Sequence, residues 1–280
     1  MKDKDFQQLV DHELSQLTWS DQQRMDTLRQ MQKKEERPVM KRKLSMVIIA
    51  VALLLALTGT AVAAGLTIPT LQEFFGYCLI PSNKGQRMMV IKGNGGEGKS
   101  QIGAVLSTIF GTNMKDGSIG KISENRFARA DLEHILLCVD DDMRMEALRQ
   151  TNYVKSIVTA QGKMDLERKG KQSYQGWMFA RLMAFSNGDL QALYDRSDGF
   201  YRRQLILSVK KKPLDREDDP FLADKLVAEV EGIFLWCLDG LRRLIANNYR
   251  FSESNRTKDN REQARRDADN VLLFLRSEGY

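Results

Sequence analysis

The stretch "GNGGEGKS", Gly93 to Ser100, restricts the possible folds more than any other part of the chain. It fits the pattern G-x-x-x-x-G-K-[ST] at every fixed position. An apolar run typical of a buried strand, "RMMVI", precedes it, and apolar residues at helical spacing follow it from Ile102 to Phe110. Strand, glycine loop and helix in this order are the context of a phosphate-binding P-loop. We therefore expect a domain that is built around a nucleotide site.

Each residue type in this loop has a chemical task. Glycines let backbone N–H groups turn inward around phosphate oxygens, and the following helix directs its positive end at them. Lys99 is expected to reach the β- and γ-phosphates of ATP, and the Ser100 hydroxyl to ligate Mg²⁺. A glycine-rich turn before a helix is also a common structural device, so the flanking elements decide in favour of a nucleotide site. The predicted nucleotide-binding residues are Gly93, Asn94, Gly95, Gly96, Glu97, Gly98, Lys99 and Ser100.

Further buried strands are expected beyond the P-loop. They are "HILLCVDDD" (134–142), "WMFARLMAFSN" (177–187) and "YRRQLILSV" (201–209), and helical patterns lie between and after them, notably over 221–249. Strands that alternate with helices predict an α/β domain with a mainly parallel sheet.

Polar residues follow two of these strands. A P-loop ATPase needs a carboxylate at the end of a neighbouring strand to hold Mg²⁺, and a second carboxylate to polarise the attacking water. Asp140 and Asp141 fit these two roles, and Asp142 fits a solvated turn. In "FSNGD", Asn187 is expected to sense the γ-phosphate, from a strand that lies between the phosphates and the acidic strand. A plain asparagine in a turn is the alternative.

The first part of the chain predicts a membrane segment. Residues 1–43 are polar and helical in pattern, and six Lys or Arg lie between positions 33 and 43. Residues 44–66 carry no charge and are long enough for one transmembrane helix, which takes about twenty apolar residues. A signal peptide cleaved near "AVAA" is the main alternative, but the basic region in front is unusually long. The basic run predicts a cytoplasmic N-terminus and export of everything after the span.

Composition adds little. The net charge of +6 only leans toward a polyanionic partner, and two histidines make a histidine-rich metal site a poor expectation. None of the three cysteines has CxxC spacing, so they are expected to be small buried hydrophobic residues in a reducing compartment.

The order of motifs carries a family resemblance. P-loop, "LLCVDDD", a basic hairpin, "FSNGD" and "DRSDGFYRR" follow each other over residues 67–280. This arrangement resembles the helicase domain of phage and plasmid primase–helicases, within the superfamily 3 helicases. The resemblance implies an AAA+-like P-loop NTPase core, a hexameric homo-oligomeric ring, and ATP hydrolysis coupled to movement on single-stranded DNA in replication.

The resemblance also implies roles for cations. An arginine of one subunit completes the ATP site of the next subunit, and Arg202 and Arg203 match it, with Arg203 slightly preferred. A DNA-contacting hairpin matches "GKMDLERKGKQSYQGW", and a solvated basic hairpin without DNA is the alternative. Its DNA-binding cations would be Lys163, Arg168, Lys169 and Lys171.

The expected domain organisation combines both halves. It consists of a polar helical segment (1–43), a transmembrane helix (44–66), an ATPase domain (67–250) and a polar, truncated helical segment (251–280). The first 64 residues resemble the N-termini of small bacterial single-span membrane proteins related to anti-sigma factors. Export conflicts with a cytoplasmic ATPase. The leading function is therefore a DNA helicase or translocase, and the alternatives are a non-functional chimera joined near Ala64, a membrane-anchored interaction protein with a remnant ATPase domain, or a P-loop switch without DNA.

Overall fold

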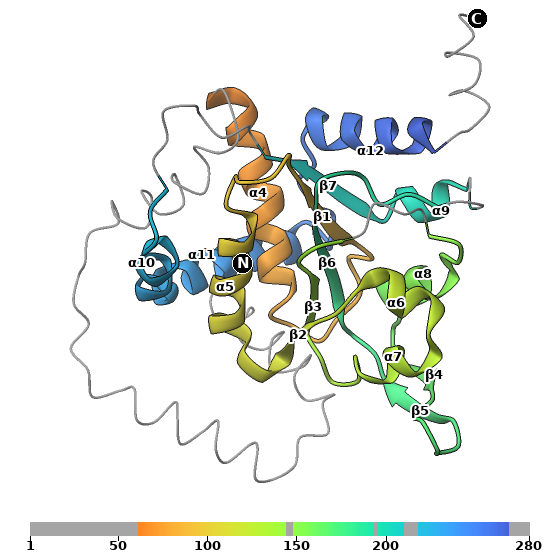
Figure 1. The fold of residues 1–280 in the computed structure, drawn as a ribbon. Coiled ribbons are helices and arrows are strands. Elements are labelled where there is room, and N and C mark those ends of the chain that lie inside the picture. Colours follow the sequence, from red (N-terminus) through yellow and green to blue (C-terminus); the bar gives the residue numbers. More distant parts are fainter. Residues whose placement is uncertain (1–60, 144–147, 193–194, 196, 210–217, 269–280) are drawn as a thin grey trace, which may run out of the picture.

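The structure is a computed structural model that describes residues 61–143, 148–192, 195, 197–209 and 218–268 (Figure 1). Segment 1–43 and residues 44–60 of the expected membrane span lie outside the described residues, as do residues 269–280.

A five-stranded parallel sheet forms the centre of the domain, as the alternating pattern predicts. Its spatial order is β2–β3–β6–β1–β7. Met89 of β1 pairs with Met183 of β6 on one side and with Leu205 of β7 on the other. The strands are β1 (Met88–Lys92), β2 (Met114–Asp116), β3 (Leu137–Asp140), β6 (Arg181–Ser186) and β7 (Gln204–Ser208).

Helices cover both faces of this sheet (Figure 1). Residues of β1 alternate between the two cores, because successive side chains of a strand point to opposite faces. Met89 and Ile91 join one core with α4 (Ala61–Tyr77), α5 (Lys99–Phe110), α10 (Leu222–Ala228) and α11 (Val230–Ala246). Met88 and Val90 join the other with α6 (Ile119–Glu124), α7 (Arg126–Ala130), α8 (Asn152–Thr159), α9 (Asp198–Tyr201) and α12 (Asn255–Asp267).

Several elements differ from the sequence expectations. The expected strand 177–187 is two strands, since β5 (Tyr174–Trp177) ends before β6 begins, and β5 pairs with β4 (Lys163–Leu166) instead. The helical pattern 221–249 is two helices that meet at Glu229. The short β2, which follows the 3₁₀ turn Gly111–Asn113, lacks an apolar run and was not predicted.

The polar C-terminal helix is docked onto the domain. Ala264 and Thr257 of α12 are buried, and Asn260 Nδ2 donates to the carbonyl of Ile206 in β7 at 3.0 Å. The polar helical segment expected over 251–280 is therefore packed against the domain in the part that the structure describes.

Helix α4 runs through the end of the expected membrane span at Leu66 without a break. From Thr70 onward its inward residues are buried in the α/β domain. Within the described part of the chain, no helix combines the length and the apolar character needed to cross a bilayer.

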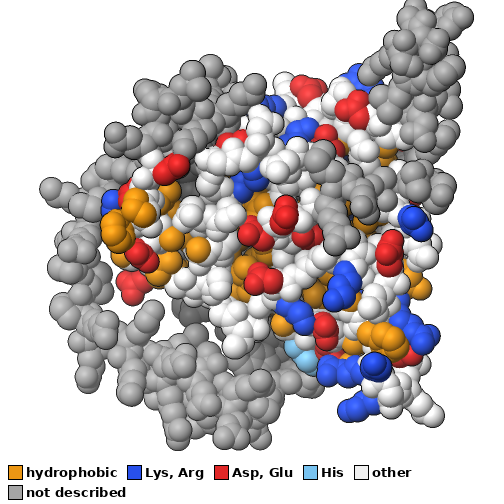
Figure 2. Space-filling view, in the orientation of Figure 1, with side chains coloured by type: hydrophobic (Ala, Val, Ile, Leu, Met, Phe, Trp, Pro, Cys, Tyr) orange, Lys and Arg blue, Asp and Glu red, His pale blue; other side chains and the backbone are white. Residues whose placement is uncertain are grey.

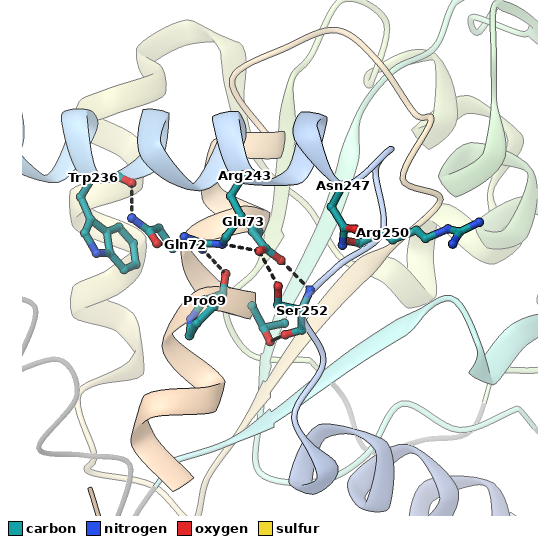
Figure 3. A network of polar contacts seen from close by, with 9 residues as sticks. Pro69, Gln72, Glu73, Trp236, Arg243, Asn247, Arg250 and Ser252 are labelled. Carbon is teal, nitrogen blue, oxygen red and sulfur yellow. Dashed lines mark hydrogen bonds and ion pairs between the residues drawn. The ribbon is translucent and has the colours of Figure 1, made fainter. Parts of the chain in front are cut away.

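A polar network fastens α4 to α11 (Figure 3). The Glu73 carboxylate is fully buried and accepts from Arg243 Nε at 2.6 Å and from Ser252 N at 2.7 Å. Arg243 also donates to Gln72 Oε1 at 2.8 Å, and Gln72 Nε2 donates to the carbonyl of Trp236 at 2.8 Å. A buried carboxylate is tolerated where it is paired and hydrogen-bonded in this way. The network makes α4 an integral part of the domain.

The same two helices touch backbone to backbone at Gly76 and Gly240. A Cβ on Gly240 would overlap the backbone carbonyl of Gln72, and one on Gly76 would overlap that of Cys237. Backbone cannot move aside as a flexible side chain does. Small residues at both positions are what allow this crossing.

We expect Gly240→Ala to lower the free energy of unfolding by about 3 kcal/mol, because the new methyl forces α4 and α11 apart. Urea unfolding of the full chain measures it. The matched control is Gly103→Ala in α5, where a Cβ would meet Phe185 at an ordinary 3.5 Å. That change should be neutral or stabilising by up to about 1 kcal/mol. Equal effects of the two substitutions would contradict the close crossing.

Candidate nucleotide site

The P-loop connects β1 to α5, as the sequence predicts. Gly95, Gly96 and Gly98 have φ values of 101°, 76° and 88°. Residues other than glycine rarely adopt this left-handed backbone conformation, so the glycines are needed for the turn itself. Helix α5 begins at Lys99, directly after the turn, with its N-terminus toward the loop.

A cavity of about 500 Å³ lies against this loop. That volume is in the range of small-molecule sites. The carboxyl ends of β1, β3 and β6 converge here, and the order of strands puts β6 between β1 and β3, as was expected for the strand of Asn187. Besides P-loop residues, the lining includes Asp141, Asp142, Asn187, Asp218, Asp219 and Leu222.

Lys99 lies at the centre of a polar cluster. Its Nζ is 3.0 Å from Glu97 Oε2 and 3.4 Å from Asn187 Oδ1. Glu97, with 1 % of its surface exposed, also accepts from the backbone N–H groups of Asn94 and Gly95. Burial acts to raise the pKa of Glu97, but the hydrogen bonds from Asn94 and Lys99 outweigh it and hold the pKa below its usual value.

The first of the three consecutive aspartates is separated from the other two. Asp140 Oδ2 accepts from the backbone N–H of Ile119 at 2.7 Å, at the start of α6. Burial raises the pKa of Asp140, and this hydrogen bond opposes the rise. Asp141 and Asp142 are exposed and line the cavity.

Strand alternation explains this division. Leu137 and Val139 face the core of α5, whereas Cys138 faces the core of α6, and Asp140 follows the same parity. The structure therefore does not bring Asp140, the predicted partner of Ser100 for Mg²⁺, into the lining. Asp142, which was expected to be a turn residue only, lines it together with Asp141.

Asp189, two residues after Asn187, forms an ion pair beside this site that the sequence reasoning missed. Lys92 Nζ, at the end of β1, lies 2.9 Å from Asp189 Oδ1 and 3.0 Å from Oδ2. The pair ties the turn after Asn187 to the residue that precedes the P-loop. The motif "FSNGD" contains this aspartate, but nothing in the sequence pairs it with Lys92. Asp218, Asp219 and Leu222 were also missed, because they enter the site from far along the chain.

The structure keeps Arg202 and Arg203 away from the cavity. They lie between α9, which ends at Tyr201, and β7, whose first residue, Gln204, pairs with Met88 at the start of β1. The P-loop follows the other end of β1, four residues on, or about 13 Å at the rise of a parallel strand. Arg202 is exposed, whereas Arg203 Nη1 donates to the carbonyl of Gly199. The sequence predicted a strand over 201–209 that would include both arginines, but β7 begins only at Gln204.

The basic hairpin exists and consists of β4 and β5, with Lys163 opposite Trp177 and Gly170 (φ 76°) in the turn. Figure 2 shows Lys and Arg side chains gathered at the lower right, where Figure 1 places this hairpin. Lys169 and Lys171 are exposed.

Arg168 and Lys163 are held by neighbours in the hairpin. Arg168 Nη2 lies 3.0 Å from Glu133 Oε2 and its Nε 2.9 Å from the Tyr174 hydroxyl. Lys163 Nζ lies 5.7 Å from the ring centre of Trp177. Of the four predicted DNA-binding cations, Lys169 and Lys171 are thus the two whose side chains have no partner among the described residues.

One protein family matches part of this chain. A family described as "Family of unknown function (DUF5906)" matches residues 91–203, from the end of β1 to Arg203. A comparison with curated proteins gave no match. The resemblance of the first 64 residues to anti-sigma-related membrane proteins therefore has no support.

Solved structures of the NrS-1 C-terminal region share the fold. One has a TM-score of 0.59 at 17% identity, covering 85% of this chain and 54% of that one, and another has 0.58 at 18% identity, covering 82% and 53%. This chain spans about half the length of that region. The JCV helicase, with a TM-score of 0.46 at 14% identity, covers 88% of this chain and 66% of its own, and is too distant to add to the argument. The mixed α/β fold with a parallel sheet is thereby supported independently of the P-loop motif.

Proposed function

We propose that this chain is an ATP-dependent DNA translocase of the helicase type. The observation that carries the proposal is the convergence of Lys99, Ser100, Asp141 and Asn187 on one cavity at the carboxyl edge of the sheet. These are the residue types that phosphoryl transfer needs: a cation for the phosphates, a hydroxyl for the metal, a carboxylate and a polar sensor.

The residues fit a Mg·ATP complex. Ser100 and the exposed carboxylates of Asp141 and Asp142 offer the hard oxygen ligands that Mg²⁺ prefers, together with the phosphate oxygens. Bound Mg²⁺ would neutralise charge on the β- and γ-phosphates. Asp141 or Asp142 would orient and polarise the attacking water, and Lys99 would stabilise charge on the transferring phosphoryl group.

The topology supports a coupling between ATP and DNA. The β4–β5 hairpin is inserted between β3 and β6, the strands that precede Asp141 and Asn187. In this proposal, a movement of either strand against the phosphates would be transmitted along the chain to the hairpin. Lys169 and Lys171 in the turn would contact the phosphate backbone of single-stranded DNA.

We expect the full chain to hydrolyse ATP faster when single-stranded DNA is added. Lys169→Gln with Lys171→Gln should reduce this stimulation and flatten the dependence of log affinity on log salt by about 1.4, at about 0.7 per lost phosphate contact. Fluorescence anisotropy with a labelled oligonucleotide at several salt concentrations measures the slope.

The matched control removes the same charge elsewhere. Arg256→Gln with Lys258→Gln changes two exposed cations of α12 and should leave the slope unaltered. An equal loss of slope in both double variants would show that the effect comes from the net charge of the chain and not from the hairpin. Hydrolysis that ignores DNA would refute the translocase and favour an ATPase switch.

A further inference from the structure

The interior of the P-loop holds a carboxylate that the pattern G-x-x-x-x-G-K-[ST] does not require. Glu97 occupies one of the four variable positions. Its oxygens accept from Asn94 N and from Gly95 N, the latter at 2.9 Å, and pair with Lys99 Nζ at 3.0 Å. Backbone N–H groups and a lysine ammonium are the groups that a P-loop presents to phosphate.

The pair fills the space under the loop. A Cβ on Gly93 would come within 2.7 Å of Glu97 Oε2 and 2.8 Å of Lys99 Nζ. Both side chains are shielded from water, with 1 % of the Glu97 side chain and 11% of the Lys99 side chain exposed. Electrostatic attraction between them is therefore stronger than it would be on the surface. While this contact persists, the Glu97 carboxylate partly neutralises the Lys99 ammonium and weakens its attraction for a ligand's phosphates.

We propose that Glu97 is an internal substitute for phosphate, a positioning residue that keeps the loop shaped and Lys99 engaged until ATP displaces the contact. This inference rests on the proposed function. It makes Glu97 a determinant of nucleotide affinity: its negative charge competes with the β- and γ-phosphates for Lys99 and repels them. As a consequence, the loop releases its nucleotide readily, because the carboxylate pairs with Lys99 again when the nucleotide leaves.

Removing the charge should therefore tighten binding. Glu97→Gln keeps the size and one carbonyl acceptor for a loop N–H, and we expect it to lower the Kd for Mg·ATP about tenfold, which corresponds to about 1.4 kcal/mol. In steady-state hydrolysis, KM and kcat should both fall, since a nucleotide that is held longer slows product release. Loss of a purely structural contact would weaken binding instead, so the sign of the change separates the two roles.

The test is a titration of the full chain with Mg·ATP by isothermal calorimetry, in wild type, Glu97→Gln and the smaller Glu97→Ser, with Glu124→Gln as control. Glu124 is an exposed carboxylate at the end of α6, and its substitution should not change the Kd. A lower Kd in either folded Glu97 variant supports the inference. A Kd that is unchanged or higher in the folded variants, with wild type binding ATP, overturns it and leaves the proposed function standing. No binding by wild type or any variant overturns both.

Discussion

Lys99→Ala is expected to lower the affinity for Mg·ATP by about a hundredfold and to abolish measurable hydrolysis. A hydrogen bond to a charged group contributes roughly 1.5–3 kcal/mol, and about 1.4 kcal/mol is a factor of ten. Lys99 would serve both the β- and the γ-phosphate, and it is the P-loop's one ammonium group. Its loss also leaves the buried Glu97 carboxylate without its cation, facing the incoming phosphates.

Two measurements separate these effects. Calorimetry with Mg·ATP gives the affinity, and Lys258→Ala in α12 is the control for loss of one exposed lysine. Equal ATP affinity in wild type and Lys99→Ala would remove the nucleotide site from consideration. The double variant Lys99→Ala with Glu97→Gln should bind better than Lys99→Ala alone, because the uncompensated negative charge is gone.

The same pair predicts a pH dependence of stability. The pKa of Glu97 is held below its unfolded value, which is about 4.3 for glutamate. A depressed pKa contributes stability that is present above the unfolded value and is lost as the pH falls through the folded one. Lys99→Ala weakens that depression. The difference in unfolding free energy between the two proteins should therefore be largest near neutral pH and shrink in acid.

Much of the fold could be predicted from the sequence because its buried strands and its glycine loop have clear sequence patterns. The strand in "RMMVI" is a continuous apolar run after Arg87, since a parallel sheet is covered on both faces, and the glycines of the P-loop mark its turn. The short β2, by contrast, exists only because Met114 pairs with Leu137 of β3, a tertiary contact that a three-residue segment cannot announce.

The site was less predictable, because it depends on directions of side chains. Asp140 and Asp141 look equivalent in "VDDD", and only the alternation along β3 turns the first toward α6 and the second toward the cavity. Applying that alternation to the apolar residues before them would have found this. The pairing of Lys92 with Asp189 could not be found that way, since it joins the end of β1 to a turn ninety-seven residues along the chain.

Helix α4 limits where a predicted membrane segment could end and the ATPase domain begin. Its inward residues are buried in the domain from Thr70 onward, and the Glu73 network joins it to α11. A junction between a membrane segment and the ATPase domain, as in the chimera hypothesis, must therefore lie before these residues.

The arginines lead to the prediction of a shared site. Arg202 and Arg203 lie at the edge of the sheet opposite the P-loop, so they cannot reach the nucleotide of their own chain without breaking β7. If either of them acts on a transferring phosphoryl group, as the helicase proposal requires, it would act on the nucleotide of a second copy. Arg202 is exposed, whereas Arg203 is held by the carbonyl of Gly199, and burial lowers the pKa of Arg203. These contacts favour Arg202 as the acting residue and leave Arg203 to fix the end of α9.

We expect Arg202→Ala to lower kcat about a thousandfold with little change in ATP affinity, since an arginine finger contributes mainly to the transition state. Arg203→Ala should lower kcat less and should lower the melting temperature. Mixing Arg202→Ala with Lys99→Ala, each inactive alone, should restore hydrolysis, because an intact P-loop of the first variant can face an intact Arg202 of the second. The restored rate should pass through a maximum as the mixing ratio varies. A mixture that stays inactive at every ratio, while both variants assemble as wild type does, would place the completing cation within one chain and end the case for a composite site.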